Sequence, residues 1–348
     1  MDKSRCVTLT IYFDDFGPRA TAWLRTMAAS VDASLYPIND LGDWEPMGGG
    51  RGMVVCSACS PYRALAEKLT AQGALQGTFI WPEVNAESWM NDQSARSVLA
   101  QEIIVQAYPI LAPRICVEGA VGGIGASTLA FMLALDMQHR GQRVALVDMS
   151  TYGDAELLLA LGAGQRWQAF FPAESTYHPE RLRQALPSWH GITVLTGSRS
   201  GVDRPMQTVG LIEALRRSHD LVIIDCPRGM GLIDAEYQVL VGSNEPRVDE
   251  AGQRRVEHYR KAKGALCEEM GSLILTTRER RLPLARSKKA DRRGQIERQK
   301  PRSVRRHGHE WIVIPEIPHY AGHINSGIDP YPLLAQASLA LCASQVLA

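Results

Sequence analysis

A glycine-rich segment near the middle of the chain, VEGAVGGIGASTLAFML (Val117–Leu133), has the residue types and spacing of a phosphate-binding loop that runs into a helix. Glycines let successive backbone N–H groups converge on phosphate oxygens, the helix N-terminus favours an anion, and a hydroxyl group can bind magnesium. The residues that supply these features are Gly119, Gly122, Gly123, Gly125, Ser127 and Thr128. The segment contains no lysine, although such a loop normally directs one at the β- and γ-phosphates.

Two continuous apolar runs end in an aspartate: VALVD ends at Asp148 and LVIID ends at Asp225. Continuous apolar runs are typical of central parallel strands that are covered on both faces. Ligands of such sheets bind at the carboxyl ends of the strands, where both aspartates are expected to lie, so both are candidate nucleotide-binding residues. If a magnesium nucleotide is bound, Ser127 and Asp225 are the expected contacts of the metal ion.

The elements that must position these residues indicate two α/β domains, in agreement with a length of 348 residues. Short runs rich in β-branched residues alternate with helix-like stretches over residues 1–105, which predicts a small parallel-sheet domain. We expect a linker over 106–114, a second, mostly parallel-sheet domain over 115–335, and a C-terminal helix over 336–348.

The net charge of +1 is unevenly distributed. Residues 278–309 contain thirteen Lys and Arg against three acidic residues, a net charge of +10, so the rest of the chain carries about −9. The segment has no helical or strand periodicity and no aromatic residue, which indicates a flexible insertion. It could contact DNA phosphates, anionic lipid or an acidic protein, and a solvated linker or protein contact is the favoured interpretation.

No apolar run reaches the roughly 18 residues of a membrane span, and no signal peptide is evident, so we expect a cytoplasmic protein. The seven cysteines are scattered as in a reduced cytosolic protein. Only CSAC (Cys56–Cys59) has a suggestive spacing, and it lies between a strand-like and a helix-like run. A redox motif is one interpretation and a simple strand–helix junction is the favoured one. No second Cys or His pair is close enough in the sequence to complete a zinc site.

The alternation over residues 1–105 resembles the receiver (flavodoxin-like) fold of response regulators. YFDDFGP places Asp14 and Asp15 after the first strand, where receivers have an acidic pair. The third strand should then end in a phosphoacceptor aspartate, but MVVCSACSPY offers only cysteine and serine. The resemblance therefore implies a receiver-like domain that is not phosphorylated at that position.

VGGIGAST resembles the deviant Walker A loop, Lys-Gly-Gly-x-Gly-Lys-Ser/Thr-Thr, of the ParA and MinD superfamily of dimeric ATPases. The next strand of that family, its Walker B strand and its last two strands are matched in order by GQRVALVDMSTYGD, HDLVIIDCPRGMG, LILTTRERRLP and IVIPEIPHYAGHINSG. The resemblance implies a homodimer that binds ATP or ADP with Mg²⁺. It also implies that Arg278 and the loop after Pro315 contact the base, although Thr277 stands where the family usually has Asn.

Three charged groups of the family pattern are replaced. Val121 stands in place of the signature lysine that reaches the partner's nucleotide, Ala126 in place of the lysine of the loop itself, and Ser150 in place of the water-orienting aspartate. One such cation can be worth roughly 10³ to 10⁵ in the rate of phosphoryl transfer, so we expect hydrolysis near background. Backbone N–H groups and Ser127 remain, which leaves two alternatives open: weak nucleotide binding, or an empty inherited turn.

The order of the two domains and the altered loop resemble the TadZ and CpaE branch of tight-adherence pilus proteins and the related septum-site-determining proteins. The leading hypothesis is therefore a scaffold that does not hydrolyse ATP and recruits pilus or secretion proteins to a pole or to the inner face of the membrane. The alternatives are a slow ATPase in which Arg140, Arg143 or the basic segment replaces the lysine, and a protein that is tethered to DNA.

Overall fold

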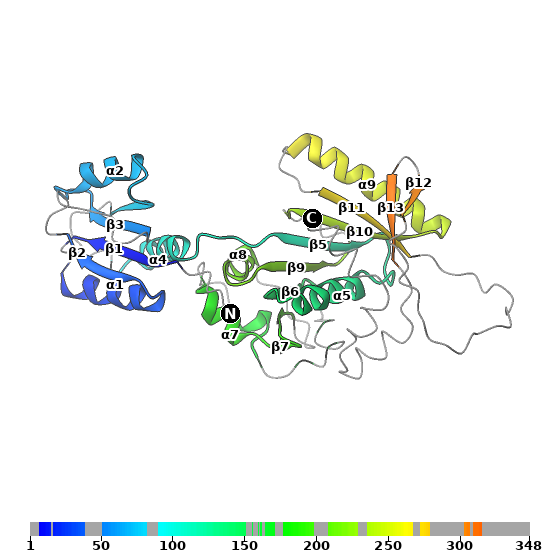
Figure 1. The fold of residues 1–348 in the computed structure, drawn as a ribbon, viewed down its shortest axis with the longest axis horizontal. Helices are drawn as coiled ribbons and strands as arrows, with labels where there is room; N and C mark the ends of the chain where they lie inside the picture. The colour runs from blue at the N-terminus through cyan, green and yellow to red at the C-terminus, as the bar shows by residue number, and fades with distance from the viewer. Residues whose placement is uncertain are drawn as a thin grey trace. The chain divides into compact units, whose positions relative to one another are not determined.

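The structure is a computed structural model, and it describes residues 7–14, 17–38, 51–81, 90–150, 155, 159, 161, 164–170, 177–197, 208–228, 235–266, 272–278, 303–306 and 309–314. The chain forms two compact units (Figure 1). The first comprises Met1–Leu111, Ala173–Glu180 and Val209–Ser218, and the second comprises Ala112–Pro172, Arg181–Thr208 and His219–Ala348.

The sheet of the first unit is entirely parallel and has the strand order β2-β1-β3-β4. Its strands are β1 (Leu9–Phe13), β2 (Ser34–Pro37), β3 (Arg51–Ser57) and β4 (Gly77–Trp81), and its helices are α1 (Pro18–Ser30), α2 (Arg63–Ala71) and α4 (Gln93–Ala107). One apolar cluster joins β1 and β3 to α1 and α4, and another joins β3 to α2. Helices therefore cover both faces of this sheet, which confirms the predicted parallel α/β organisation.

The second unit contains a nine-stranded sheet with the order β12-β13-β11-β10-β5-β9-β6-β8-β7. The strands are β5 (Arg114–Gly119), β6 (Val144–Asp148), β7 (Ser188–Trp189), β8 (Ile192–Leu195), β9 (Leu221–Cys226), β10 (Tyr237–Ser243), β11 (Ser272–Arg278), β12 (Ser303–Arg306) and β13 (His309–Ile314). Only the pairs β12–β13 and β7–β8, at the two ends of this order, are antiparallel among the described strands. A mostly parallel sheet was predicted for this part of the chain and is confirmed.

The remaining helices are α5 (Ala126–His139), α7 (Pro179–Ala185), α8 (Thr208–Ser218) and α9 (Pro246–Leu266), with a short 3₁₀ helix at Trp167–Ala169. Helix α5 is buried on all sides from Leu129 to Met137, as expected of a helix that is apolar around its circumference. It packs on the side chains of Val239 and Val241, whereas α9 packs on Leu240, so the two helices cover opposite faces of β10 (Figure 1).

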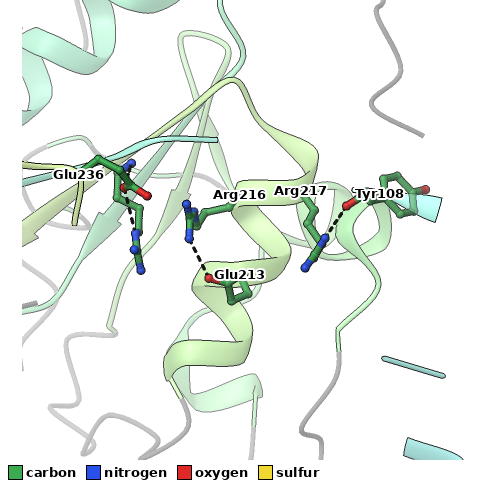
Figure 2. A network of polar contacts seen from close by, with 6 residues as sticks. Tyr108, Glu213, Arg216, Arg217 and Glu236 are labelled. Carbon is green, nitrogen blue, oxygen red and sulfur yellow. Dashed lines mark hydrogen bonds and ion pairs between the residues drawn. The ribbon is translucent and has the colours of Figure 1, made fainter. Parts of the chain in front are cut away.

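Ion pairs and hydrogen bonds hold two regions in place: the start of β5 and helix α8. Glu236 accepts hydrogen bonds from the backbone N–H of Arg114 at 2.7 Å and from its Nε at 3.2 Å, which ties the first residue of β5 to the residue preceding β10. On α8, Arg216 pairs with Glu213 at 3.0 Å and Arg217 donates to the carbonyl oxygen of Tyr108 (Figure 2). Burial lowers the pKa of Arg217, since the charged form loses hydration there.

Two expectations are corrected by the structure. The basic segment 278–309 is not irregular throughout, because Ser303–Arg306 forms β12, which pairs in an antiparallel manner with β13. A strand of four residues at the edge of a sheet is too short to show a periodicity in the sequence. Its extended conformation is stabilised by pairing with β13. The expectation that all cysteines are reduced is wrong for Cys116 and Cys226, which the structure joins as a disulfide between adjacent strands, with Cα atoms 6.4 Å apart.

Residues 279–302 and the predicted C-terminal helix 336–348 lie outside the described residues. Within the described part of the chain, no helix is both long and apolar enough to cross a membrane.

The burial of α5 gives a direct prediction for stability. Phe131 is fully buried in the cluster that α5 forms with the central strands, so Phe131→Ala should lower the free energy of unfolding by about 3–5 kcal/mol. Glu257 is exposed on α9, and Glu257→Ala should change it by less than about 0.5 kcal/mol. Urea denaturation of both variants measures the difference, and equal effects would contradict the packing described here.

Candidate phosphate-binding site

The glycine-rich loop connects the end of β5 to the start of α5, and at three of its positions the conformation of the loop requires glycine. A Cβ atom on Gly119 would lie 2.8 Å from Cγ2 of Ile124 and 2.9 Å from the carbonyl oxygen of Val121, so no side chain fits there. Gly123 and Gly125 have φ angles of 72° and 95°, in the left-handed region that other residues rarely adopt. Gly122 is exposed and a Cβ atom there would meet open space.

The first turn of α5 presents backbone donors at the end of this loop. Gly125 is the N-cap residue and has no side chain to cap the helix, and the first intrahelical bond runs from Leu129 N to Gly125 O at 3.0 Å. The N–H groups of residues 126–128 therefore have no acceptor within the helix, and the helix dipole favours an anion there. Ser127 and Thr128 lie in this turn and are half-buried. The arrangement can bind a phosphate group through the backbone alone.

Parallel pairing brings the two predicted aspartates to the same edge of the sheet as the loop. Strand β9 lies between β5 and β6, with Asp225 in register with Val117 on one side and with Asp148 on the other. Asp225 is 5% exposed, and its carbonyl oxygen accepts a hydrogen bond from Met149 N at 3.0 Å. Both aspartates thus lie where the sequence predicted. Their roles in binding a nucleotide or a metal ion stay predictions.

The carboxylate of Asp148 is occupied by donors of the protein itself. It is fully buried and accepts hydrogen bonds from Ser150 N at 2.8 Å, Ala155 N at 2.9 Å and the Thr196 hydroxyl at 2.7 Å. Its carbonyl oxygen accepts a further bond from the indole N–H of Trp167 at 3.0 Å. These bonds tie the segment after β6 to the end of β8. We infer that Asp148 stabilises the structure of this edge.

Arg278, the predicted contact of the base, is the last residue of β11 and is in register with Ser243, the last residue of β10. It therefore lies at the same carboxyl edge as the loop, with β10 between its strand and β5. The loop after Pro315, which was predicted to contact the base as well, lies outside the described residues.

The hypothesis that Arg140 or Arg143 replaces the missing lysine is wrong. Helix α5 begins at the loop and has 14 residues, about 21 Å, so Arg140 lies at its far end, where it pairs with Asp136 at 3.0 Å. Arg143 precedes β6 and pairs with Asp220, which precedes β9, so both lie at the amino edge of the sheet. Sequence proximity to the loop did not translate into spatial proximity because a full helix separates them.

The positions of the two missing lysines are occupied by packed apolar side chains. Val121 and Ile124 are partly buried against Leu240 of β10 and Val248 and Val256 of α9. Ala126, the first residue of α5, packs against the central apolar cluster of the unit. The loop is thus fastened to its own chain at the place where the resembled family has its signature lysine.

A buried polar cluster beside the loop was not predicted from the sequence. Glu118, the residue before Gly119, is 3% exposed and forms an ion pair with Arg255, whose Nε lies 2.9 Å from Oε1. Its second oxygen accepts a hydrogen bond from the hydroxyl of Tyr259 at 2.8 Å. Burial, followed by the negative charge of Glu118, raises the pKa of Tyr259. A glutamate within an apolar strand was the one available signal, because a buried charge needs a partner.

The CSAC segment does not have the properties of a redox pair. Cys56 lies in β3 and is fully buried, whereas Cys59 is exposed in the following turn, and both thiols are free. Burial, together with the charge of Asp14, raises the pKa of Cys56 to about 11, so its thiol is neutral near pH 7. This agrees with the favoured interpretation of a strand–helix junction. Asp14 directly follows β1, and Asp15 lies outside the described residues.

No cluster of three or more His, Cys, Asp or Glu side chains suited to a metal ion occurs among the residues that the structure describes. At nucleotide sites, Mg²⁺ is usually held by one or two carboxylates together with phosphate oxygens and water.

Similarity to known proteins is concentrated in this part of the chain. Residues 112–163 match the family model described as cellulose biosynthesis protein BcsQ. The chain is 30% identical over 129 residues to the chromosome partitioning protein ParA of Myxococcus xanthus, a match that covers 34% of this chain and 46% of that protein. It is also 30% identical over 118 residues to the chromosome-partitioning ATPase Soj of Thermus thermophilus, which covers 33% of this chain and 45% of that protein.

A solved structure of a ParA family ATPase from Chlorobium tepidum is 14% identical, with a TM-score of 0.47 over 68% of this chain and 98% of that one. The chain spans less than half the length of the two curated relatives described above. In the part of the chain that they cover, the sequence matches show similarity to chromosome-partitioning proteins of the ParA type.

The structural role of Asp148 predicts a loss of stability in the absence of any ligand. Asp148→Ala leaves buried donors of Ala155 and Thr196 without an acceptor and should lower the free energy of unfolding by about 3 kcal/mol. Glu250→Ala breaks the exposed pair with Arg254 and should cost about 0.5 kcal/mol. Urea denaturation followed by tryptophan fluorescence measures both. An Asp148 variant as stable as the Glu250 variant would show that these bonds contribute little.

The different environments of the CSAC cysteines predict selective alkylation. In the folded protein at about pH 8, iodoacetamide should modify Cys59 and leave Cys56 unmodified, because the Cys56 thiol is buried and neutral. Peptide mass spectrometry locates the label, and denaturation before labelling should make both residues reactive. Equal labelling of the two cysteines in the folded protein would argue against the structure of this turn.

Proposed function

We propose that the protein is a ParA/MinD-type positioning factor that binds Mg-ATP or Mg-ADP weakly and does not hydrolyse ATP efficiently. The observation that carries this proposal is the packing of Val121. It packs against an apolar cluster that includes Val248 and Val256 of α9, at the position where the resembled family has a lysine. The loop keeps its backbone donors and its hydroxyl groups, and these support binding. The charges that would stabilise the transition state are missing, and this limits hydrolysis.

The two carboxylates at the site support the same division between binding and hydrolysis. Asp225 is the candidate that helps Ser127 to hold Mg²⁺, since it is the last residue but one of β9, the strand next to the loop strand. Asp148 is engaged by three donors of the protein, and Ser150 follows it where the resembled family has a water-orienting aspartate. No carboxylate of this segment is therefore proposed to activate water.

The first unit supports the proposed branch of this class. Its strand order β2-β1-β3-β4 agrees with the first four strands of the flavodoxin-like order, and β3 ends in Cys56 and Ser57 where a receiver has a phosphoacceptor aspartate. We therefore propose a receiver-like unit that is not phosphorylated at this position, joined to a ParA/MinD-type unit, as in TadZ- and CpaE-like proteins. Within this proposal the protein acts as a cytoplasmic homodimer that recruits pilus or secretion proteins to the pole or to the inner face of the membrane.

The test is an isothermal titration with ATP, with and without Mg²⁺, combined with an assay of phosphate release. We expect saturable binding that Mg²⁺ strengthens, together with phosphate release near background. Ser127→Ala should abolish the effect of Mg²⁺, and Ser188→Ala, which changes an exposed serine of β7, should not.

Each part of the proposal has its own contrary result. Rapid ATP turnover that Ser127→Ala abolishes would overturn the proposal of a protein that does not hydrolyse ATP. An absence of binding at millimolar ATP would overturn the nucleotide part and leave the loop as architecture in a scaffold.

A further inference from the structure

Helix α9 contacts the phosphate loop through two kinds of interaction at once. On one side of the loop, Val121 and Ile124 pack against an apolar cluster to which α9 contributes Val248 and Val256, two residues eight positions apart. Directly before the loop, Glu118 is held by Arg255 and Tyr259, which lie on the same helix. The apolar and the ionic contacts therefore fasten both the entry and the middle of the loop to a single element.

Such fastening matters because a loop rich in glycine is costly to order. Glycine loses more conformational freedom on folding than any other residue, and Gly122, Gly123 and Gly125 follow one another closely here. In a loop with a lysine, a bound phosphate can supply part of the interaction that orders it. In this chain, contacts with protein groups of α9 can supply part of the interaction that orders the loop.

The ionic contact is positioned to transmit the state of α9 to the loop. Glu118 is nearly fully buried, and Arg255 has a side-chain exposure of 22%, so the pair is largely shielded from water. Removal of Arg255 deprives the buried charge of Glu118 of this cation, which is unfavourable. The neighbour Arg254 has a side-chain exposure of 77% and pairs with Glu250 on the same helix.

We propose that α9 sets the conformation of the phosphate loop, with Arg255 as a positioning residue that acts through Glu118. The loop is then held in its anion-binding shape before any nucleotide arrives. A factor that displaces α9 loosens the loop, and a factor that holds α9 keeps the loop formed. This inference goes beyond the proposed function, because it concerns the loop of the protein without a ligand and does not depend on nucleotide binding or hydrolysis.

The test is hydrogen–deuterium exchange of the full chain in the absence of nucleotide, read on peptides that cover residues 117–128. We expect the amides of residues 126–128 to be unprotected, because they have no acceptor within the helix. The amides of residues 117–120 should be protected, because residues 117–119 end β5 and Ala120 N donates to the carbonyl oxygen of Val241 at 2.9 Å. Arg255→Gln should accelerate the exchange of residues 117–120 roughly tenfold or more, which corresponds to about 1.4 kcal/mol. Peptides from β6 and from the far half of α5 should change little, whereas a general loss of stability would accelerate exchange there as well.

Three further variants separate positioning from simple damage. Arg254→Gln is the matched control and should leave exchange of the loop unchanged, because Arg254 pairs only with exposed Glu250 in the contacts described here. Tyr259→Phe removes a single hydrogen bond to Glu118 and should accelerate loop exchange by roughly three- to tenfold, even if Arg255→Gln does not fold. The double variant Glu118→Gln/Arg255→Gln removes the unpaired charge and should restore much of the protection.

The contrary results are equally clear. Free exchange of residues 117–120 in the unmodified protein would overturn the proposal, because the start of the loop would then not be preformed. So would Tyr259→Phe and Arg255→Gln variants that fold but leave the exchange of the loop unchanged. Neither result depends on ATP, so a failure here is distinct from a failure of the titration and phosphate-release experiments.

Discussion

The parallel pairing of β9 with β5 on one side and β6 on the other is the constraint on which the candidate site depends. It places Asp225 in register with Val117 and with Asp148, so the loop and both carboxylates meet at one edge of the sheet. A slip of one residue would turn every side chain of β9 to the opposite face. The fully buried backbone and side chains of these strands make such a slip very unfavourable, and the edge is therefore well defined.

At this site the backbone and the side chains have different roles. The backbone supplies the donors, through glycine conformations and the first turn of α5, whereas side chains at the same edge mostly stabilise the protein itself. Val121 packs, Asp148 accepts three internal hydrogen bonds, and Glu118 forms a buried ion pair. An edge of this kind has the shape of an anion site even where its side chains serve the stability of the protein.

Much of this arrangement could be predicted from the sequence, because its signals are local. The apolar runs that end in Asp148 and Asp225 and the glycine spacing before α5 each occupy a short stretch, and their common edge follows from a general rule for parallel sheets. The contacts that sequence reasoning missed join distant residues. Glu118 and Arg255 are 137 positions apart, Asp148 and Thr196 are 48 apart, and Cys116 and Cys226 are 110 apart. The error over Arg140 and Arg143 arose from the opposite cause, since neighbours in sequence are separated by the length of a helix.

The packing of Val121 also limits which side chains can replace it at this position. A lysine at position 121 would have to leave the apolar surface formed by Leu240, Val248 and Val256, since an ammonium group loses its hydration there. Its departure would expose part of that surface and release the loop from α9. A change of Val121 by itself would therefore be opposed by the rest of the domain, so the residue at this position and the apolar residues of α9 form a set that would have to change together.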